Sequence, residues 1–251
     1  MLRALIALAC LFVCSRPAAA MVGGAGPPPS AIARAVVLIV GSRGNFCTGA
    51  ALAPDLVLTV AHCVLPGSDY KIVQYDAARQ PLLRDVASVT AHPKFDLKTM
   101  LAHRATADVA LLKLAAPLAG VEPATFGTLS AVAPGDAFTV AGMGVATRGD
   151  GKSGGTVRAA ALVATGRPGN LQIRLVDPAA QGERAGLGAC TGDSGAPVFR
   201  SVAGGFTLIG VVSWSTGPGN SAGCGGLTGV TPLTLYGEWI TQTAKKLGNP
   251  F

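Results

Sequence analysis

The sequence predicts an all-β fold in which two packed six-stranded antiparallel β-barrels are followed by a C-terminal α-helix. First, the 251 residues include 34 glycines and 17 prolines, and these turn formers separate many short apolar runs. Second, about a dozen runs of strand length fall into two sets, which is typical of paired barrels. Third, helical spacing of apolar residues is clear only near the C-terminus.

The first set of runs predicts an N-terminal barrel over about residues 30–120. β-Branched and other apolar residues dominate these runs, and turn formers such as Pro54 and Asp55 separate them. A proline-containing connector, 115–135, leads to the second set. The expected strands of the first barrel are 35–40, 45–51, 56–60, 72–75, 86–91 and 109–114.

The second set predicts a C-terminal barrel over about residues 130–231, and a helix is expected over about 232–247. Thr231 is a suitable helix cap and Pro232 suits the first helical position. The expected strands are 138–141, 157–163, 171–176, 198–199, 206–213 and 229–230. The apolar positions of the helix, spaced three or four residues apart along one face, are Leu233, Tyr236, Ile240, Ala244 and Leu247.

The first twenty residues have the pattern of a secretory signal peptide. Arg3 supplies a basic start, residues 4–13 form an apolar run too short to span a bilayer, and the three alanines at 18–20 suit signal peptidase. An uncleaved anchor is the alternative. We therefore expect a mature domain of residues 21–251 that is secreted or periplasmic and has no membrane contact after the signal is removed.

The composition excludes several classes of protein. Apolar residues make up 49% of the chain and charged residues only 13%, which excludes intrinsic disorder. The net charge of +7 falls to +5 when Arg3 and Arg16 leave with the signal peptide. The remaining basic residues are scattered, so we expect no nucleic-acid partner and interpret the charge as ordinary solvated surface. We expect a monomer.

Three segments carry residues suited to nucleophilic catalysis. They are TVAHC at 59–63, TADVALL at 106–112 and GACTGDSGAPV at 188–198. A serine hydroxyl is a weak nucleophile unless a base takes its proton, and histidine fills that role near neutral pH. A buried carboxylate can orient the imidazole. With these segments in the order His, Asp, Ser, the mature chain resembles the chymotrypsin/trypsin-like serine peptidases over essentially its whole length.

The resemblance implies a role for each matching residue. Ser194 is the nucleophile, His62 is the general base and Asp108 holds the imidazole, while the N–H groups of Gly192 and Ser194 form the oxyanion hole. Protein or peptide substrates are implied, and no metal or organic cofactor. Two further histidines, at 92 and 103, match no catalytic motif and are interpreted as structural.

The mature chain has four cysteines, Cys47, Cys63, Cys190 and Cys224. An even number in an exported chain predicts disulfides, and three pairings are possible from the residues alone. The sequence has no Cys-x-x-Cys motif, which argues against a zinc ribbon. The resemblance implies the pairs Cys47–Cys63 and Cys190–Cys224.

The resemblance also implies an activation pair. The segment Met21-Val22-Gly23-Gly24 resembles the N-terminus of an activated family member, whose α-ammonium group pairs with the Asp before the nucleophile, here Asp193. Signal cleavage directly before Met21 would create this terminus without a propeptide. The alternative is a coincidence in which Met21 is another start codon.

The last implied site is the pocket for the residue before the cleaved bond. Its base is Gly188, where relatives that bind Lys or Arg have Asp, and its walls are Ser213, Trp214, Ser215 and the segment near Gly229. Because a neutral pocket does not offset the cost of burying a cation, we expect uncharged apolar residues there.

Two other classes of function fit parts of the pattern. A catalytically silent family member would act as a binding protein, but such proteins usually lack the His or the Ser, and this chain has both. A cationic surface-binding protein would use the charge of +5 and show steep salt dependence.

One departure from the family is Met143, which lies between two glycines where relatives usually have Trp.

Overall fold

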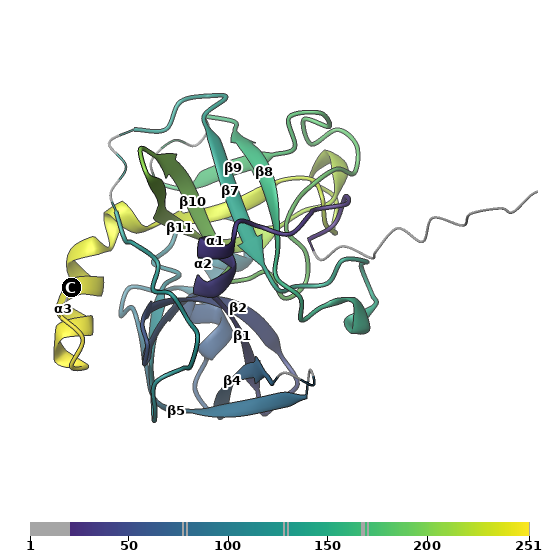
Figure 1. Cartoon of the computed structure of the whole chain (residues 1–251). Helices are drawn as coiled ribbons and strands as arrows, with labels where there is room; N and C mark the ends of the chain where they lie inside the picture. Colours follow the sequence, from purple (N-terminus) through teal and green to yellow (C-terminus); the bar gives the residue numbers. More distant parts are fainter. Residues whose placement is uncertain are drawn as a thin grey trace, which may run out of the picture.

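A computed structural model of the chain describes residues 21–250 except 77, 79, 128, 130, 167, 168 and 170. The predicted signal peptide, 1–20, lies outside the described residues. Figure 1 shows two β-barrels stacked on one another, with helix α3 (Gly237–Lys246) beside them. The prediction of two six-stranded antiparallel barrels and a C-terminal helix is confirmed.

The N-terminal barrel is closed, with its strands hydrogen-bonded in the order β1-β2-β3-β6-β5-β4. Every residue of β3 is buried, and six of the eight residues of β2 are buried as well. The small side chains of β2 suit this position because the strand also lies against the second barrel. The strands are β1 Val36–Gly41, β2 Phe46–Ala53, β3 Leu56–Thr59, β4 Tyr70–Tyr75, β5 Pro81–Ala91 and β6 Ala110–Leu114.

The C-terminal barrel is also closed, in the order β10-β11-β12-β9-β8-β7. All of its strand pairs are antiparallel, and a two-residue turn connects β10 to β11, whereas longer loops join the other neighbours. The strands are β7 Ala137–Gly142, β8 Arg158–Ala164, β9 Ile173–Val176, β10 Pro197–Val202, β11 Gly205–Ser215 and β12 Thr228–Pro232.

The terminal helix begins later than the sequence predicts, so the expected start at 232 is wrong. Pro232 is the last residue of β12, where it pairs with Gly210 and has extended backbone angles. A 3-10 turn, η4 (Leu233–Leu235), follows, and α3 begins only at Gly237. The closing strand of the barrel therefore overrides the local preference of proline for a helix start. Ile240, on the predicted apolar face, is fully buried.

Two short helices, α1 (Ser30–Ala35) and α2 (Leu97–Leu101), are not predicted by the sequence. The side chain of Asp96 caps α2 by accepting a hydrogen bond from the Thr99 N–H at 2.6 Å. Three further 3-10 turns are η1 (Ala61–Val64), η2 (Gly151–Ser153) and η3 (Pro218–Asn220). Within the described part of the chain, no helix has the length and apolarity needed to cross a membrane.

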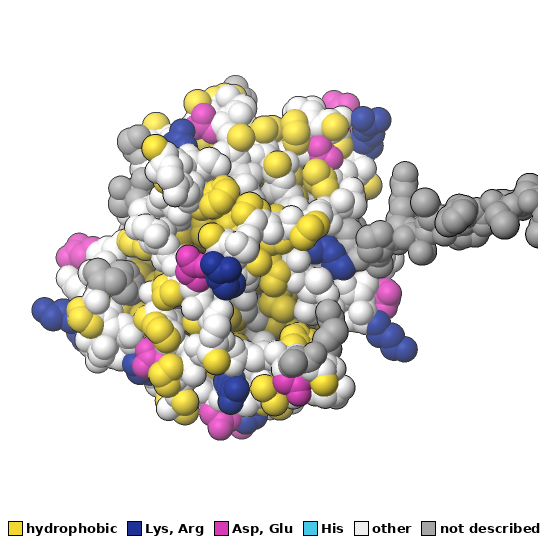
Figure 2. Space-filling view, viewed as in Figure 1, with side chains coloured by type: hydrophobic (Ala, Val, Ile, Leu, Met, Phe, Trp, Pro, Cys, Tyr) yellow, Lys and Arg dark blue, Asp and Glu magenta, His cyan; other side chains and the backbone are white. Residues whose placement is uncertain are grey.

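Two apolar clusters support the barrels. The first fills the N-terminal barrel around Leu58 and Leu111 and extends to Phe199 of β10 and Ile240 of α3, so it also joins the barrels. The second fills the C-terminal barrel around Leu162. Each fully buried leucine contributes roughly 2 kcal/mol. Figure 2 shows apolar side chains gathered where the barrels meet on one face, and Lys and Arg side chains scattered around it.

Candidate active site

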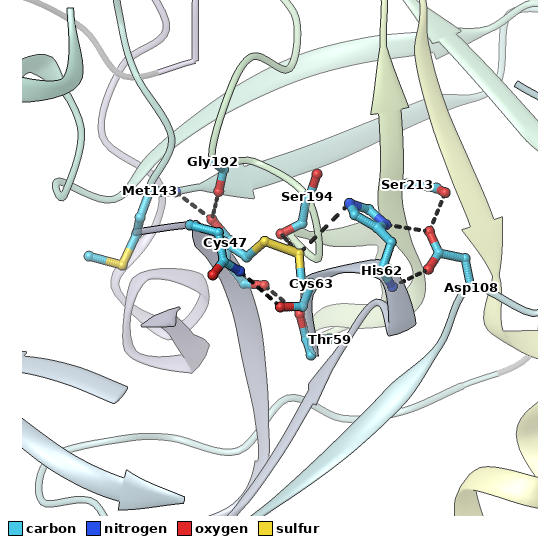
Figure 3. Close-up of a disulfide and its surroundings, with 11 residues drawn as sticks. Cys47, Thr59, His62, Cys63, Asp108, Met143, Gly192, Ser194 and Ser213 are labelled. Carbon is cyan, nitrogen blue, oxygen red and sulfur yellow. Dashed lines mark hydrogen bonds and ion pairs between the residues drawn. A yellow bond between two sulfur atoms is a disulfide. The ribbon is translucent and has the colours of Figure 1, made fainter. Parts of the chain in front are cut away.

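His62 and Asp108 come from the N-terminal barrel and form a fixed pair. His62 lies in η1 directly after β3, and Asp108 lies two residues before β6, fully buried. The imidazole Nδ1 is 2.8 Å from Asp108 Oδ2, and the backbone N–H of His62 donates to Asp108 Oδ1 at 3.0 Å (Figure 3). Both carboxylate oxygens therefore bind the same residue, which fixes the plane of the ring.

Ser213 completes the surroundings of this carboxylate from the other barrel. Its hydroxyl, near the end of β11, donates to Asp108 Oδ2. Three donors thus satisfy a carboxylate that would be costly to bury without partners. The resemblance places Ser213 in the wall of the substrate pocket, but the sequence does not predict its contact with Asp108.

Ser194 lies in the loop before β10, on the Nε2 side of the imidazole and opposite Asp108 (Figure 3). Among the described residues no hydrogen bond joins its hydroxyl to His62, and Nε2 lies 3.8 Å from Cys63 Sγ. Catalytic hydrogen bonds are often long in free enzymes and tighten when substrate binds. The imidazole is 17% exposed, so a substrate can reach it.

In the loop around Ser194, some backbone N–H groups are paired and others have no acceptor among the described residues. The N–H of Asp193 donates to the Cys190 carbonyl at 3.0 Å, and the N–H of Gly195 donates to the Val212 carbonyl at 2.7 Å. Within the described residues, the N–H groups of Gly192 and Ser194 have no acceptor. These are the two groups that the resemblance assigns to the oxyanion hole.

Only glycine fits at position 192. Its φ is +90°, and a Cβ there would lie 2.0 Å from Cε2 of Phe46. The close approach of Phe46, the first residue of β2, therefore ties the identity of this loop residue to the packing of the other barrel.

Two disulfides hold the loops that carry these residues. Cys47–Cys63 joins β2 to η1, and Cys190–Cys224 joins the loop of Ser194 to the segment before β12. They are the two pairs that the resemblance implies. The bonds close 16 and 34 residues, for which chain entropy predicts a stabilisation of about 3 to 4 kcal/mol each.

Asp193 is a fully buried carboxylate whose only partners in the described chain are backbone groups. Its oxygens accept hydrogen bonds from the N–H of Gly144 and the N–H of Cys190, each at 2.9 Å. Burial raises the pKa of Asp193 to about 7, and these two hydrogen bonds only partly counteract the effect. A Cβ on Gly144 would lie 2.6 Å from Asp193 Cγ, so a glycine is needed beside this carboxylate.

Met21, the other member of the predicted activation pair, is also fully buried. It packs in the second apolar cluster with Ala189 and Ala196, which flank the loop of Asp193, and the next residue, Val22, bridges to Gly188. No ion pair or hydrogen bond joins Met21 to Asp193 in the described structure. The segment is nevertheless anchored in the region that the resemblance assigns to it.

The predicted pocket residues lie on two neighbouring strands and one loop. Trp214 and Gly229 are register partners of β11 and β12, and a Cβ on Gly229 would lie 2.1 Å from the indole. Ser215 pairs with Thr228, whose hydroxyl accepts from the N–H of the residue after Gly188 at 3.1 Å. The structure thus brings the predicted base and walls together.

Trp214 has partners that no motif indicates. The imidazole of His103 stacks on the indole, with ring centroids 4.4 Å apart and planes 10° from parallel. With its side-chain oxygen facing the indole and its nitrogen facing His103, Gln172 accepts a hydrogen bond from the indole N–H at 2.9 Å and donates one to the His103 carbonyl at 3.3 Å. His103 itself has a positive φ of 54°. A loop of the first barrel is therefore held against the indole of the second.

Comparison with known proteins agrees with this arrangement. The sequence profile described as Trypsin matches residues 21–240. The chain belongs to the trypsin family of serine proteases. It is similar to the vitellin-degrading protease of Bombyx mori, with 30% identity over 227 residues that cover 81% of this chain and 78% of the relative. It is also similar to human kallikrein-11, with 25% identity over 213 residues that cover 80% and 72% of the two chains.

Proposed function

We propose that the chain is a secreted serine endopeptidase that hydrolyses peptide bonds through an acyl-enzyme on Ser194. The observation that carries the proposal is the buried Asp108, which accepts hydrogen bonds from the ring and the backbone of His62 and from the Ser213 hydroxyl. This arrangement fixes one ring tautomer and leaves Nε2 as the base on the side of Ser194. Membership of the trypsin family supports the same reaction.

The proposed reaction begins when the Ser194 hydroxyl oxygen attacks the carbonyl carbon of the substrate and its proton passes to Nε2 of His62. Asp108 stabilises the imidazolium, and the N–H groups of Gly192 and Ser194 stabilise the oxyanion. The proton then moves from Nε2 to the leaving amine, which gives an ester on Ser194. His62 next takes a proton from water, which attacks the ester and releases the acid and the free serine.

Activation is proposed to follow from signal removal. In the unprocessed chain the Met21 nitrogen is an amide and carries no charge, so Asp193 is buried without a cation. Cleavage before Met21 would give an α-ammonium group, and the buried, two-donor environment of Asp193 supports its use as the partner. The pair would then hold the loop that carries Gly192 and Ser194.

The proposed substrate preference is for an uncharged apolar residue before the cleaved bond. Gly188, at the proposed pocket base, has no side chain to pair with a cation, and the wall residues Ser213, Trp214, Ser215 and Gly229 are neutral. A Lys or Arg side chain would therefore enter the pocket without compensation for its desolvation.

The location and partners are proposed on the same basis. Two disulfides suit an oxidising compartment, so we place the enzyme outside the cytoplasm, secreted or periplasmic. Its partners are protein or peptide substrates, and it acts as a monomer without cofactor, nucleic acid or membrane. The scattered Lys and Arg side chains on the face drawn in Figure 2 support the exclusion of nucleic acid.

The test is cleavage of a peptide library by protein expressed from the full sequence, with its N-terminus determined by mass spectrometry. We expect cleavage and stoichiometric labelling of Ser194 by an organophosphonate. Ser194→Ala and His62→Ala should lower turnover by several orders of magnitude with no loss of thermal stability, because the triad acts as a unit. A catalytically silent binding protein would show neither cleavage nor labelling, and that result would refute the proposal.

A further inference from the structure

Thr48, near the start of β2, is a fully buried polar residue where the two barrels meet. Its hydroxyl donates to the carbonyl oxygen of Gly192 at 2.8 Å. Its backbone N–H donates to the carbonyl oxygen of Ser194, also at 2.8 Å. One residue of the N-terminal barrel thus holds the carbonyl groups of both Gly192 and Ser194, the two residues proposed to form the oxyanion hole.

The Thr48 hydroxyl also reaches a third segment. It accepts a hydrogen bond from the N–H of Met143 at 3.1 Å. The next N–H along the chain, that of Gly144, donates to Asp193 Oδ1 at 2.9 Å. The hydroxyl is therefore both donor and acceptor. It joins β2 to Gly192, directly before Asp193 in the chain, and to the segment of Met143 and Gly144, which contacts the Asp193 carboxylate.

The nucleophile loop is also in close contact with Thr48. Gly195 has a φ of +82°, and a Cβ there would lie 2.1 Å from the Thr48 carbonyl oxygen and 2.2 Å from the Thr59 hydroxyl. That hydroxyl donates to the same Thr48 carbonyl at 2.8 Å. The Thr48 carbonyl is thus fixed by a hydrogen bond within its own barrel, and the loop of Ser194 has no room to move towards β2.

We propose that Thr48 is a positioning residue for peptide hydrolysis, which holds the loop so that the N–H groups of Gly192 and Ser194 stay directed at the oxyanion. The reason is conformational. Gly192 has no Cβ to restrict its backbone, so an external hydrogen bond to its carbonyl is what limits its rotation. Oxyanion donors are effective because they are oriented before the reaction begins. The proposal rests on the proposed peptidase function, and Thr48 itself does not touch substrate.

Three variants test this role. Thr48→Val has the same shape without the hydroxyl, and Thr48→Ser keeps the hydroxyl. Tyr70→Phe is the matched control, since the Tyr70 hydroxyl donates to the Leu65 carbonyl at 2.7 Å in the same barrel and makes no hydrogen bond to the loop of Ser194. Each protein is expressed from the full sequence, and its N-terminus is confirmed by mass spectrometry.

We expect Thr48→Val to lower kcat by about 10- to 100-fold with little change in KM, less than the ~10²- to 10³-fold loss when an oxyanion donor itself is removed. The inhibition constant of a peptide boronate, whose tetrahedral adduct places an oxygen in the same hole, should rise in parallel. Thr48→Ser should stay near the wild type. Tyr70→Phe should lower the melting temperature without lowering kcat.

Hydrogen exchange measured by mass spectrometry supplies a readout that does not need turnover. Exchange in the peptide covering 191–195 should speed up in Thr48→Val and remain unchanged in Thr48→Ser and Tyr70→Phe. Unchanged exchange in Thr48→Val would overturn the proposal whether or not the wild type cleaves peptides. Equal kcat values for Thr48→Val and the wild type would also overturn it. A wild type that neither cleaves nor is labelled would instead refute the proposed function.

A second inference comes from Arg174, in β9, which has an unsatisfied buried donor. Its Nε is buried without a hydrogen-bond partner, and its guanidinium carbon lies 5.5 Å from the centroid of the Trp214 indole. No carboxylate among the described residues lies within ion-pair distance of it. A guanidinium presents donors in a planar fork that matches a carboxylate, so this site lacks the partner to which it is best suited.

Arg174 lies next to the proposed pocket wall, because it is the register partner of Gly229 in β12 and its guanidinium lies over the indole of Trp214. Burial and the charge of Arg174 both lower the pKa of His103, which stacks on the same indole. The imidazole is therefore neutral at neutral pH and Arg174 is the cation at this indole. We infer that Arg174 binds an acidic side chain of the substrate, an inference that rests on the proposed function.

Matched peptides with Glu or Gln at each position on either side of the cleaved bond test the inference. We expect the wild type to favour Glu at one position by roughly 5-fold in kcat/KM at low salt, and less in 0.5 M NaCl, because salt screens such pairs. Arg174→Gln should abolish the preference. Arg200→Gln, which removes an arginine already 3.8 Å from Asp136, should keep it.

Binding of the same peptides to the Ser194→Ala protein separates this inference from the proposed function. Tighter binding of the Glu peptide that is lost in the Ser194→Ala, Arg174→Gln double variant would support the carboxylate site even without turnover. Equal binding of Glu and Gln peptides, or a Glu preference that survives Arg174→Gln, would refute it.

Discussion

One alanine inserted before Met21 should destabilise the processed protein at pH 8 and have little effect near pH 4. The insertion leaves the fold intact but moves the α-ammonium group away from Asp193. That carboxylate is fully buried with two backbone N–H donors, and burial raises its pKa to about 7. The effect of the insertion should therefore depend on whether Asp193 is ionised.

The size of the effect follows from the pKa. A folded value of about 7 against the ordinary 3.8 corresponds to roughly 4 kcal/mol, at about 1.36 kcal/mol for each pKa unit. Because the folded pKa lies above the unfolded one, an unpaired Asp193 costs no stability below about pH 4. The cost grows as pH rises and is complete above about 7. In the native-terminus protein the ammonium of the proposed pair should offset this cost, until pH climbs through the raised pKa of that amine, above ~7.7–8.0.

Denaturant unfolding at pH values from 4 to 9 measures the effect directly, and turnover at pH 8 measures its functional consequence. The extended variant should lose up to roughly 4 kcal/mol at pH 8, and turnover should fall by about 10²- to 10³-fold if the loop order depends on the pair. In an Asp193→Asn background the extension should cost nothing, because no charge remains to pair. An extended variant as stable and active at pH 8 as the native terminus would refute the reasoning.

Three further substitutions test other parts of the site. Asp108→Asn should lower turnover by about 10⁴-fold with an unchanged circular dichroism spectrum, because the amide cannot hold the imidazole in the required tautomer; a small loss would argue against the triad. Gly188→Asp should shift cleavage of the peptide library towards Lys and Arg. The new Cβ would lie 3.0 Å from the Cα of Gly225, which limits the gain in rate. A wild type that already cleaves strictly after Lys or Arg would contradict the pocket assignment. Gly192→Ala should reduce both melting temperature and turnover, because its Cβ would lie 2.0 Å from the Phe46 ring.

The strands of both barrels could be predicted because each is a local pattern. The expected strand at 109–114 is β6, Ala110–Leu114, and the expected strand at 206–213 lies within β11, Gly205–Ser215. The start of α3 could not be predicted, because proline favours both a helix start and an extended strand end. Only the pairing of Pro232 in β12 with Gly210 in β11 decides between them. The five-residue helix α2 is too short to show a period.

The residues that join the two halves of the candidate site have no local pattern. His62, Asp108 and Ser194 lie in motifs, so the family resemblance identifies them. The Ser213 hydroxyl that donates to Asp108 is 105 residues away from it, and the Thr48 hydroxyl that donates to Gly192 is 144 residues away. In the sequence each lies within a predicted strand, and neither position shows that its hydroxyl group contacts the other barrel.

Thr48 and Ser213 are buried polar residues whose hydroxyl groups form hydrogen bonds to the other barrel. A hydroxyl inside an apolar strand must find a partner or destabilise the fold, and a barrel interior offers few partners because the strand backbone is already paired. Both hydroxyls find partners in the other barrel, Thr48 at the loop of Gly192 and Ser213 at Asp108. The requirement to satisfy buried polar groups therefore joins the barrels at the place where the proposed chemistry needs groups from both. A sequence can indicate such a residue as a lone Ser or Thr in a buried run, but its partner becomes visible only when the barrels are packed together.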